Sequence, residues 1–308
     1  MIRLLPLLLL VLLVACAGQG DAPPAEVEAS GTPVRPVADT SEVDAETAAA
    51  FDRVTDRARA EAWHEQPFGD LVQAVGYELL GARYQDGLLD VAPGEELVVN
   101  LAAFDCVLYV ENVLALARGI AREDYAFATY VGNLEALRYR QGELDGYCSR
   151  LHYFTDWIHD NDERGHVEDV TAAIGGVPFE KTLDFMTTHR EAYPRLVSDS
   201  AFACIVDMEA TTRDRALFYI PQDQITAVYD QLQPGDLIAT ATSIDGLDVT
   251  HTGFVYRDAE GGTGFMHASS TGEVKVSDDL ADYIQGNAQQ IGILVARPMD
   301  PRPAAPTP

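Results

Sequence analysis

Cysteines and histidines are the side chains in this sequence that most readily supply a nucleophile and a base near neutral pH. Cys106 stands where a helix is expected to begin, because apolar residues recur at helical spacing after Asp105. Unpaired N–H groups at a helix start favour a thiolate, and Asp105 is a good capping residue. Burial in an apolar core is the commoner role for a lone cysteine. Cys106 alone therefore does not establish catalysis.

Two histidines lie on strands that we expect to be neighbours. His251 falls within residues 249–256 and His267 within residues 263–267, with a Gly-containing turn at 258–262 between them. Amide hydrolysis by cysteine needs a thiolate, a nearby base and donors for the oxyanion. A cysteine at a helix start, a histidine on a strand and a polar residue one strand over fit that need. The three residues together favour catalysis.

The N-terminus predicts export and lipidation. Arg3 precedes an apolar run at residues 4–15, which is shorter than the roughly 20 residues that span a bilayer. The run ends in LVAC at residues 13–16, which resembles the bacterial lipoprotein box, whose cysteine carries the lipid. We therefore expect a signal peptide at 1–15 and a lipid on Cys16; an ordinary signal peptide with a chance cysteine is the alternative. Residues 16–45 are rich in Ala, Gly, Pro, Glu and Thr and predict a disordered tether, as does the tail at 298–308.

The residue after Cys16 bears on the destination of the chain. It is Ala17 rather than aspartate, and resemblance to the sorting of Gram-negative lipoproteins implies the periplasmic face of the outer membrane. A Gram-positive origin would instead place the lipid in the plasma membrane.

The cysteine count limits disulfide formation. With Cys16 lipidated, three cysteines remain in an oxidising compartment, so one disulfide at most can form. If Cys106 stays free to react, Cys148 and Cys204 either pair with each other or remain separate buried thiols. The sequence leaves both arrangements open.

Charge and spacing exclude several classes of function. The formal net charge is −28, from 49 acidic and 21 basic residues, which argues against nucleic-acid binding. No His-Glu-x-x-His or other zinc-ligand spacing occurs, so we expect a reaction without metal or cofactor. We also expect a monomer.

The pattern of elements predicts an α+β domain over residues 46–297. Helical periodicity appears at 46–82, 105–119, 123–139, 150–160, 181–190 and 203–215, and strands are expected at 237–240, 249–256, 263–267, 273–276 and 291–296. Helices followed by a meandering antiparallel sheet are typical of the α+β class. Residues 122–233 then form a helical insert between Cys106 and His251.

Ordered short motifs give this pattern a family resemblance. They are GARY at 81–84, FDC at 104–106, PGDLI at 234–238, HTGFV at 251–255 and MHA at 266–268. In that order they resemble the motifs of the NlpC-type cell-wall cysteine peptidases, which are papain-like and cleave amide bonds in peptidoglycan stems. The tyrosine of the first motif, Tyr84, corresponds to one that lines their active site.

A narrower resemblance covers residues 65–297. The segments VENVLALA at 110–117, RYR at 138–140, SRLHYFTDW at 149–157 and GLDVTH at 246–251 resemble the N-acetylmuramoyl-L-alanine amidase-like branch of that superfamily. The resemblance implies hydrolysis of the amide between the lactyl group of muramic acid and L-alanine, on small muropeptides. Two alternatives are an NlpC-type endopeptidase cutting between D-glutamate and the diamino acid, and a muropeptide-binding lipoprotein without turnover.

The resemblance also implies roles for individual residues. Cys106 would be the nucleophile, His251 the general base and His267 the residue that orients it, with Asp248 as the other candidate for orientation. The expected substrate-binding residues are Tyr84, Asp105, Arg150, His152, Tyr153, Trp157 and Asp248.

Overall fold

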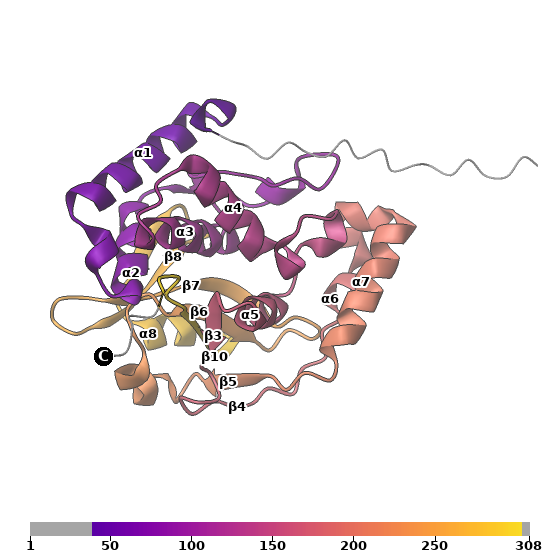
Figure 1. The fold of residues 1–308 in the computed structure, drawn as a ribbon. Helices are drawn as coiled ribbons and strands as arrows, with labels where there is room; N and C mark the ends of the chain where they lie inside the picture. Colours follow the sequence, from indigo (N-terminus) through magenta and orange to yellow (C-terminus); the bar gives the residue numbers. More distant parts are fainter. Residues whose placement is uncertain (1–38, 304–308) are drawn as a thin grey trace, which may run out of the picture. The chain divides into compact units, whose positions relative to one another are not determined.

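The computed structural model describes residues 39–303 (Figure 1). The predicted signal peptide, Cys16, most of the predicted tether and residues 304–308 lie outside the described residues. The first α-helix begins at Ala45 and the last strand ends at Pro298, close to the predicted limits of 46 and 297. Within residues 39–303, no helix is both long enough and apolar enough to cross a membrane.

Three N-terminal α-helices precede the main sheet, and the third of them begins at Cys106. Helix α1 (Ala45–Ala60) starts at Asp44, whose carboxylate accepts a hydrogen bond from the Thr47 N–H at 2.9 Å. Helix α2 (Phe68–Glu78) follows, and α3 (Cys106–Ala121) begins at the cysteine as predicted. Between α2 and α3, the two-residue strands β1 (Arg83–Tyr84) and β2 (Ala103–Phe104) pair in parallel.

The chain is of the α+β class, with a large antiparallel sheet at its centre. The sheet order is β4-β5-β10-β6-β7-β8-β9, and β3 also pairs with β10. All of these pairings are antiparallel. The strands are β3 (Val167–Asp169), β4 (Val177–Pro178), β5 (Phe218–Pro221), β6 (Leu237–Thr242), β7 (Val249–Arg257), β8 (Thr263–Ala268), β9 (Val274–Ser277) and β10 (Gln290–Pro298).

Both faces of the central strands are buried, and alternate residues serve opposite faces. Phe254 and Met266 join one core with the N-terminal helices, whereas Val255 and Phe265 join a second core with the short helix α8 (Leu280–Gln285). Helix α3 packs on β7 and β8 (Figure 1). The start of α3 is thereby held against the strand that carries His251.

The insert between Cys106 and His251 contains strands as well as helices, which corrects the prediction of a helical segment. Its α-helices are α4 (Phe127–Arg138), α5 (Phe154–Glu163), α6 (Phe185–Thr188) and α7 (Asp199–Thr212). It also contributes β3, β4 and β5 to the main sheet. These strands have two to four residues, too few to show alternation in sequence, and form because β10 and one another offer pairing partners.

Short 3-10 helices connect the larger elements. They are Thr40–Glu42, Trp63–Glu65, Leu88–Asp90, Arg140–Gly142, Tyr147–Ser149, Arg190–Ala192, Pro194–Val197 and Ile225–Gln231.

A disulfide resolves the question of the two remaining cysteines. Cys148 and Cys204 are bonded, with their Cα atoms 6.2 Å apart. The bond joins the segment around Tyr147 to helix α7, and it leaves Cys106 as the free thiol of residues 39–303.

Candidate active site

Cys106 lines a cavity of about 280 Å³ at the start of α3. Asp105 caps the helix, because its carboxylate accepts a hydrogen bond from the Leu108 N–H at 2.7 Å. The backbone N–H groups of a first helical turn have no partner within the helix. The thiol therefore sits beside hydrogen-bond donors that could face a developing oxyanion.

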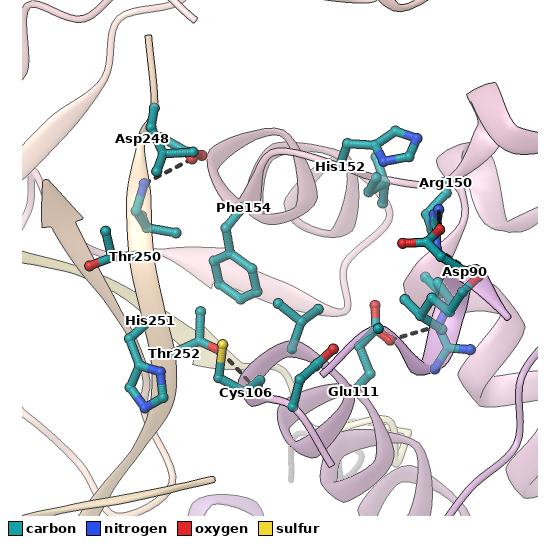
Figure 2. A pocket seen from close by; sticks show the side chains of 18 of the residues that line it. Asp90, Cys106, Glu111, Arg150, His152, Phe154, Asp248, Thr250, His251 and Thr252 are labelled. Carbon is teal, nitrogen blue, oxygen red and sulfur yellow. Dashed lines mark hydrogen bonds and ion pairs between the residues drawn. The ribbon is translucent and has the colours of Figure 1, made fainter. Parts of the chain in front are cut away.

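His251 reaches the same cavity from β7 (Figure 2). The β6–β7 register shifts here, so that residues 250 and 251 of β7 together lie opposite Thr240. Such a bulge re-aims side chains and is frequent beside active sites. The next residue, Thr252, donates its hydroxyl hydrogen to the carbonyl oxygen of Cys106 at 2.9 Å. This bond ties the strand of the histidine to the first residue of the cysteine helix.

His267 on β8 holds the ring of His251. Nε2 of His251 and Nδ1 of His267 are 2.7 Å apart, and the two rings are nearly perpendicular at 87°. The bond occupies Nε2 of His251 and leaves Nδ1 as the nitrogen that can serve Cys106. In the described structure no hydrogen bond yet joins the thiol to His251. Catalytic hydrogen bonds are often formed only when substrate is bound.

Burial keeps the cysteine and its base neutral in the free protein. Burial, together with the Asp105 carboxylate, raises the pKa of the Cys106 thiol to about 12, although hydrogen bonds from Thr252 act in the opposite direction. Burial also lowers the pKa of His251 to about 4. The sequence argument from the helix start favoured a thiolate. The structure instead gives a neutral thiol and a neutral imidazole in the free protein.

The opposite wall of the cavity carries paired charges (Figure 2). Arg150 donates to the Asp90 carboxylate at 2.7 Å, and Arg138 donates to Glu111 at 2.7 Å. His152 also lines this wall, and its Nε2 is 2.9 Å from the carbonyl oxygen of Tyr147. Burial and the neighbouring Arg150 charge lower the pKa of His152 to about 3, so the ring is neutral.

The structure brings together most of the predicted site residues. Asp105, Arg150, His152 and Asp248 line the cavity with Cys106 and His251. Tyr84 does not line this cavity. It nevertheless lies near the start of α3, because β1 pairs Tyr84 with Phe104. Burial, together with the nearby acidic groups, raises the pKa of Tyr84 to about 12.

Tyr153 and Trp157 lie in the core rather than in the predicted substrate-binding wall. The Tyr153 hydroxyl donates to Glu209 at 2.8 Å, and the Trp157 indole N–H donates to Glu111 at 3.2 Å. Both side chains are buried because the inward stripe of α5 packs on the core and Tyr153 precedes its first turn.

Asp248 has a different role from the one predicted as an alternative. Its carboxylate accepts hydrogen bonds from the N–H and the hydroxyl of Thr155, at 2.8 and 2.9 Å. It therefore fixes the start of α5 to β7, and the hydrogen-bond partner of His251 is His267.

Several cavity residues had no individual prediction. Asp90 comes from a turn region without a motif, whereas Glu111 and Arg138 stood inside the quoted motifs without an assigned role. Phe154 was likewise inside a motif, and Thr252 directly follows His251. Adjacency to His251 was the available signal for Thr252.

The comparison with family models decides the family. The model described as AmiA-like, N-acetylmuramoyl-L-alanine amidase-like, matches residues 74–293. The chain belongs to this amidase-like family. The match includes Cys106, His251 and His267, and it spans every element that contributes to the cavity. A comparison with curated proteins finds no significant match.

Solved structures resemble the amidase-like chain along most of its length. An N-acetylmuramoyl-L-alanine amidase from Bacteroides uniformis ATCC 8492 is 31% identical, with 75% of this chain and 99% of that chain covered and a TM-score of 0.72. A Bacteroides fragilis protein named as a putative xylanase is 33% identical, with 73% of this chain and 99% of that chain covered and a TM-score of 0.64. A Legionella pneumophila protein at 21% identity, with 82% and 97% covered and a TM-score of 0.58, shares the fold alone.

Metal-binding side chains do not cluster in the amidase-like chain between residues 39 and 303. No group of three or more His, Cys, Asp or Glu residues in that range has a geometry that could hold a metal ion.

Proposed function

We propose that the chain is a papain-like, NlpC-type cysteine amidase that cleaves the amide between the lactyl group of N-acetylmuramic acid and L-alanine in muropeptides. The observation that supports this most directly is the shared cavity of Cys106 and His251, in which His267 binds the far nitrogen of His251 at 2.7 Å. Membership of the amidase-like family supports the choice of a peptidoglycan amide.

The reaction begins from a neutral thiol and a neutral imidazole. Sγ of Cys106 attacks the lactyl carbonyl carbon while its proton moves to Nδ1 of His251. Backbone N–H groups at the start of α3 stabilise the oxyanion. Collapse of the tetrahedral intermediate breaks the C–N bond, and Nδ1–H of His251 protonates the departing L-alanine amine. Water, activated by His251, then hydrolyses the thioester and regenerates the thiol.

We propose a small muropeptide, rather than intact sacculus, as the substrate. The cavity of about 280 Å³ is near the lower end of the size range of small-molecule sites. Arg138 and Arg150 also line the cavity, and their guanidinium groups carry hydrogen-bond donors for the substrate.

Product masses from defined muropeptides test the proposed bond. We expect a free muramic-acid sugar and a stem peptide that begins with L-alanine. Cys106→Ser should lose several orders of magnitude in turnover, because the base and donors are placed for sulfur. Products cut between D-glutamate and the diamino acid would establish the endopeptidase instead. Tight binding without turnover would identify a muropeptide-binding protein.

We further propose that a lipid on Cys16 holds the enzyme at the periplasmic face of the outer membrane as a monomer. The LVAC sequence at residues 13–16 and Ala17 support this placement. Cys16→Ala should prevent fatty-acid labelling and release the protein into the soluble periplasmic fraction. Membrane retention of the unlabelled variant would contradict the anchor.

A further inference from the structure

Ser277 on β9 lies within hydrogen-bonding distance of His267. Its Oγ is 3.2 Å from Nε2 of His267, the ring nitrogen that does not contact His251. The β8–β9 register pairs Ser277 with Phe265, so Ser277 is a diagonal neighbour of His267 on the same sheet face. Adjacent strands thus supply one group each to a continuous line: His251 from β7, His267 from β8 and Ser277 from β9.

His267 sits in an apolar sandwich. The Phe265 ring is stacked on it at 4.7 Å and 11°, and the Tyr283 ring lies 4.7 Å away at 59°. The residue is 1% exposed. In the described part of the chain its ring nitrogens bond to His251 and Ser277, and neither bond involves a carboxylate. The usual aspartate or asparagine that fixes a catalytic histidine is therefore replaced here by a neutral ring whose own tautomer must be fixed.

A neutral imidazole has one N–H and one lone pair, so the two bonds of His267 must run in opposite directions. If its Nε2 carries the hydrogen, Ser277 accepts, and Nδ1 accepts from Nε2–H of His251. The Nδ1 lone pair of His251 is then free for the thiol proton. If Nδ1 of His267 carries the hydrogen, Nε2 of His251 accepts it, and Nδ1 of His251 is already protonated. Only the first arrangement makes His251 a base toward Cys106.

We propose that Ser277 is a positioning residue that selects this first arrangement by accepting the Nε2–H of His267. The inference rests on the proposed function. It applies most strongly after proton transfer, because the His251 imidazolium donates from both nitrogens and requires His267 to accept at Nδ1. The Nε2–H of His267 must then find an acceptor, and in the described structure the group within hydrogen-bonding distance is Oγ of Ser277, whose hydroxyl is able to accept.

Ser277→Thr and Ser277→Val in the full chain form a matched pair that differs in the hydroxyl. We expect kcat of the Val variant to fall about tenfold or more below that of the Thr variant, because a buried N–H without an acceptor destabilises the state in which His251 is protonated. KM should be similar, because Ser277 does not line the cavity. Ser277→Ala repeats the test without the added methyl groups, and circular dichroism confirms folding of each variant.

Nitrogen-15 NMR of histidine-labelled protein reads the tautomer without any turnover. In wild type and the Thr variant, Nε2 of His267 should have the shift of a protonated nitrogen and Nδ1 that of an unprotonated one. The Ala and Val variants should move toward the reverse pattern. A His267 → Gln variant assigns the signals.

The outcomes separate the two proposals. Equal kcat in the Thr, Val and Ala variants, or a wild-type His267 protonated on Nδ1, overturns the role of Ser277 and leaves the amidase proposal standing. Wild-type protein that has the expected tautomer but cleaves no muropeptide overturns the amidase proposal, and with it any role of Ser277 in hydrolysis.

Discussion

The indole N–H of Trp157 donates to Glu111, whose other carboxylate oxygen accepts from Arg138. Glu111 and Arg138 line the cavity, whereas Trp157 is fully buried behind them. Trp157 therefore supports the cavity wall from inside the core and does not itself line the cavity.

This relationship predicts different effects for two neighbouring aromatic residues. Trp157→Phe removes a buried hydrogen bond and should lower the free energy of unfolding by about 1–3 kcal/mol, with KM unchanged. Phe154→Leu is the comparison, because Phe154 stacks on Trp157 but also lines the cavity, and its KM should rise. Denaturant unfolding and steady-state kinetics measure both. A raised KM in Trp157→Phe at unchanged stability would instead show that Trp157 contributes to substrate binding.

Thr252→Val should lower kcat by about tenfold while keeping the shape of the side chain. The change removes the hydroxyl bond to the Cys106 carbonyl, which holds the histidine strand against the cysteine helix. Thr252→Ser retains the hydroxyl and serves as the control. Equal kcat for the Val and Ser variants would show that this bond has no part in catalysis.

The reactivity of Cys106 should rise with pH through the neutral range. The thiolate is the reactive form, and a pKa of about 12 means that its fraction increases about tenfold per pH unit up to that value. Iodoacetamide labelling, followed by mass spectrometry of the Cys106 peptide, should therefore show no plateau between pH 6 and 9. A plateau at neutral pH would indicate a preformed thiolate–imidazolium pair instead.

In the pH profile of kcat/KM, the fall on the acid side should occur well below the usual pKa of histidine. His251 must be unprotonated to act as a base, and its pKa of about 4 means that kcat/KM falls only as pH drops through about 4. Burial raises the pKa of Asp105 to about 6, so an Asp105→Asn variant separates any inflection due to that carboxyl. An acid limb centred between 6 and 7 in both proteins would contradict the neutral-pair mechanism.

Loss of the disulfide should destabilise the insert. The bond closes a loop across a separation of 56 residues, for which the chain-entropy model gives about 4 kcal/mol. The Cys148→Ser and Cys204→Ser double variant should show that loss in denaturant unfolding. Its KM should rise, because Tyr147 and Arg150 beside Cys148 line the cavity. Free alkylation of both cysteines in the denatured wild-type protein would show that the bond is absent.

The sequence by itself determined the main elements, and it singled out Cys106, His251 and His267 as candidate site residues. Regular apolar spacing located the helix that starts at Cys106, and alternation located the strands of His251 and His267, because these are local properties of the chain. The order of short motifs indicated the family. The short strands β3, β4 and β5 escaped prediction, since only their partners in the sheet make them strands.

Only the tertiary structure decided how the side chains meet. The bulge at residues 250–251 aims His251, and it depends on how β6 and β7 align along their length. Burial determines whether an aromatic residue such as Trp157 faces the cavity or the core, and burial also moves the pKa of Cys106 upward against the effect of its helix start. Burial depends on contacts between residues that are far apart in the chain. Contacts of the same kind place Ser277 beside His267 and join Cys148 to Cys204. Local spacing carries no information about such contacts, because they arise only when the strands and the insert pack together.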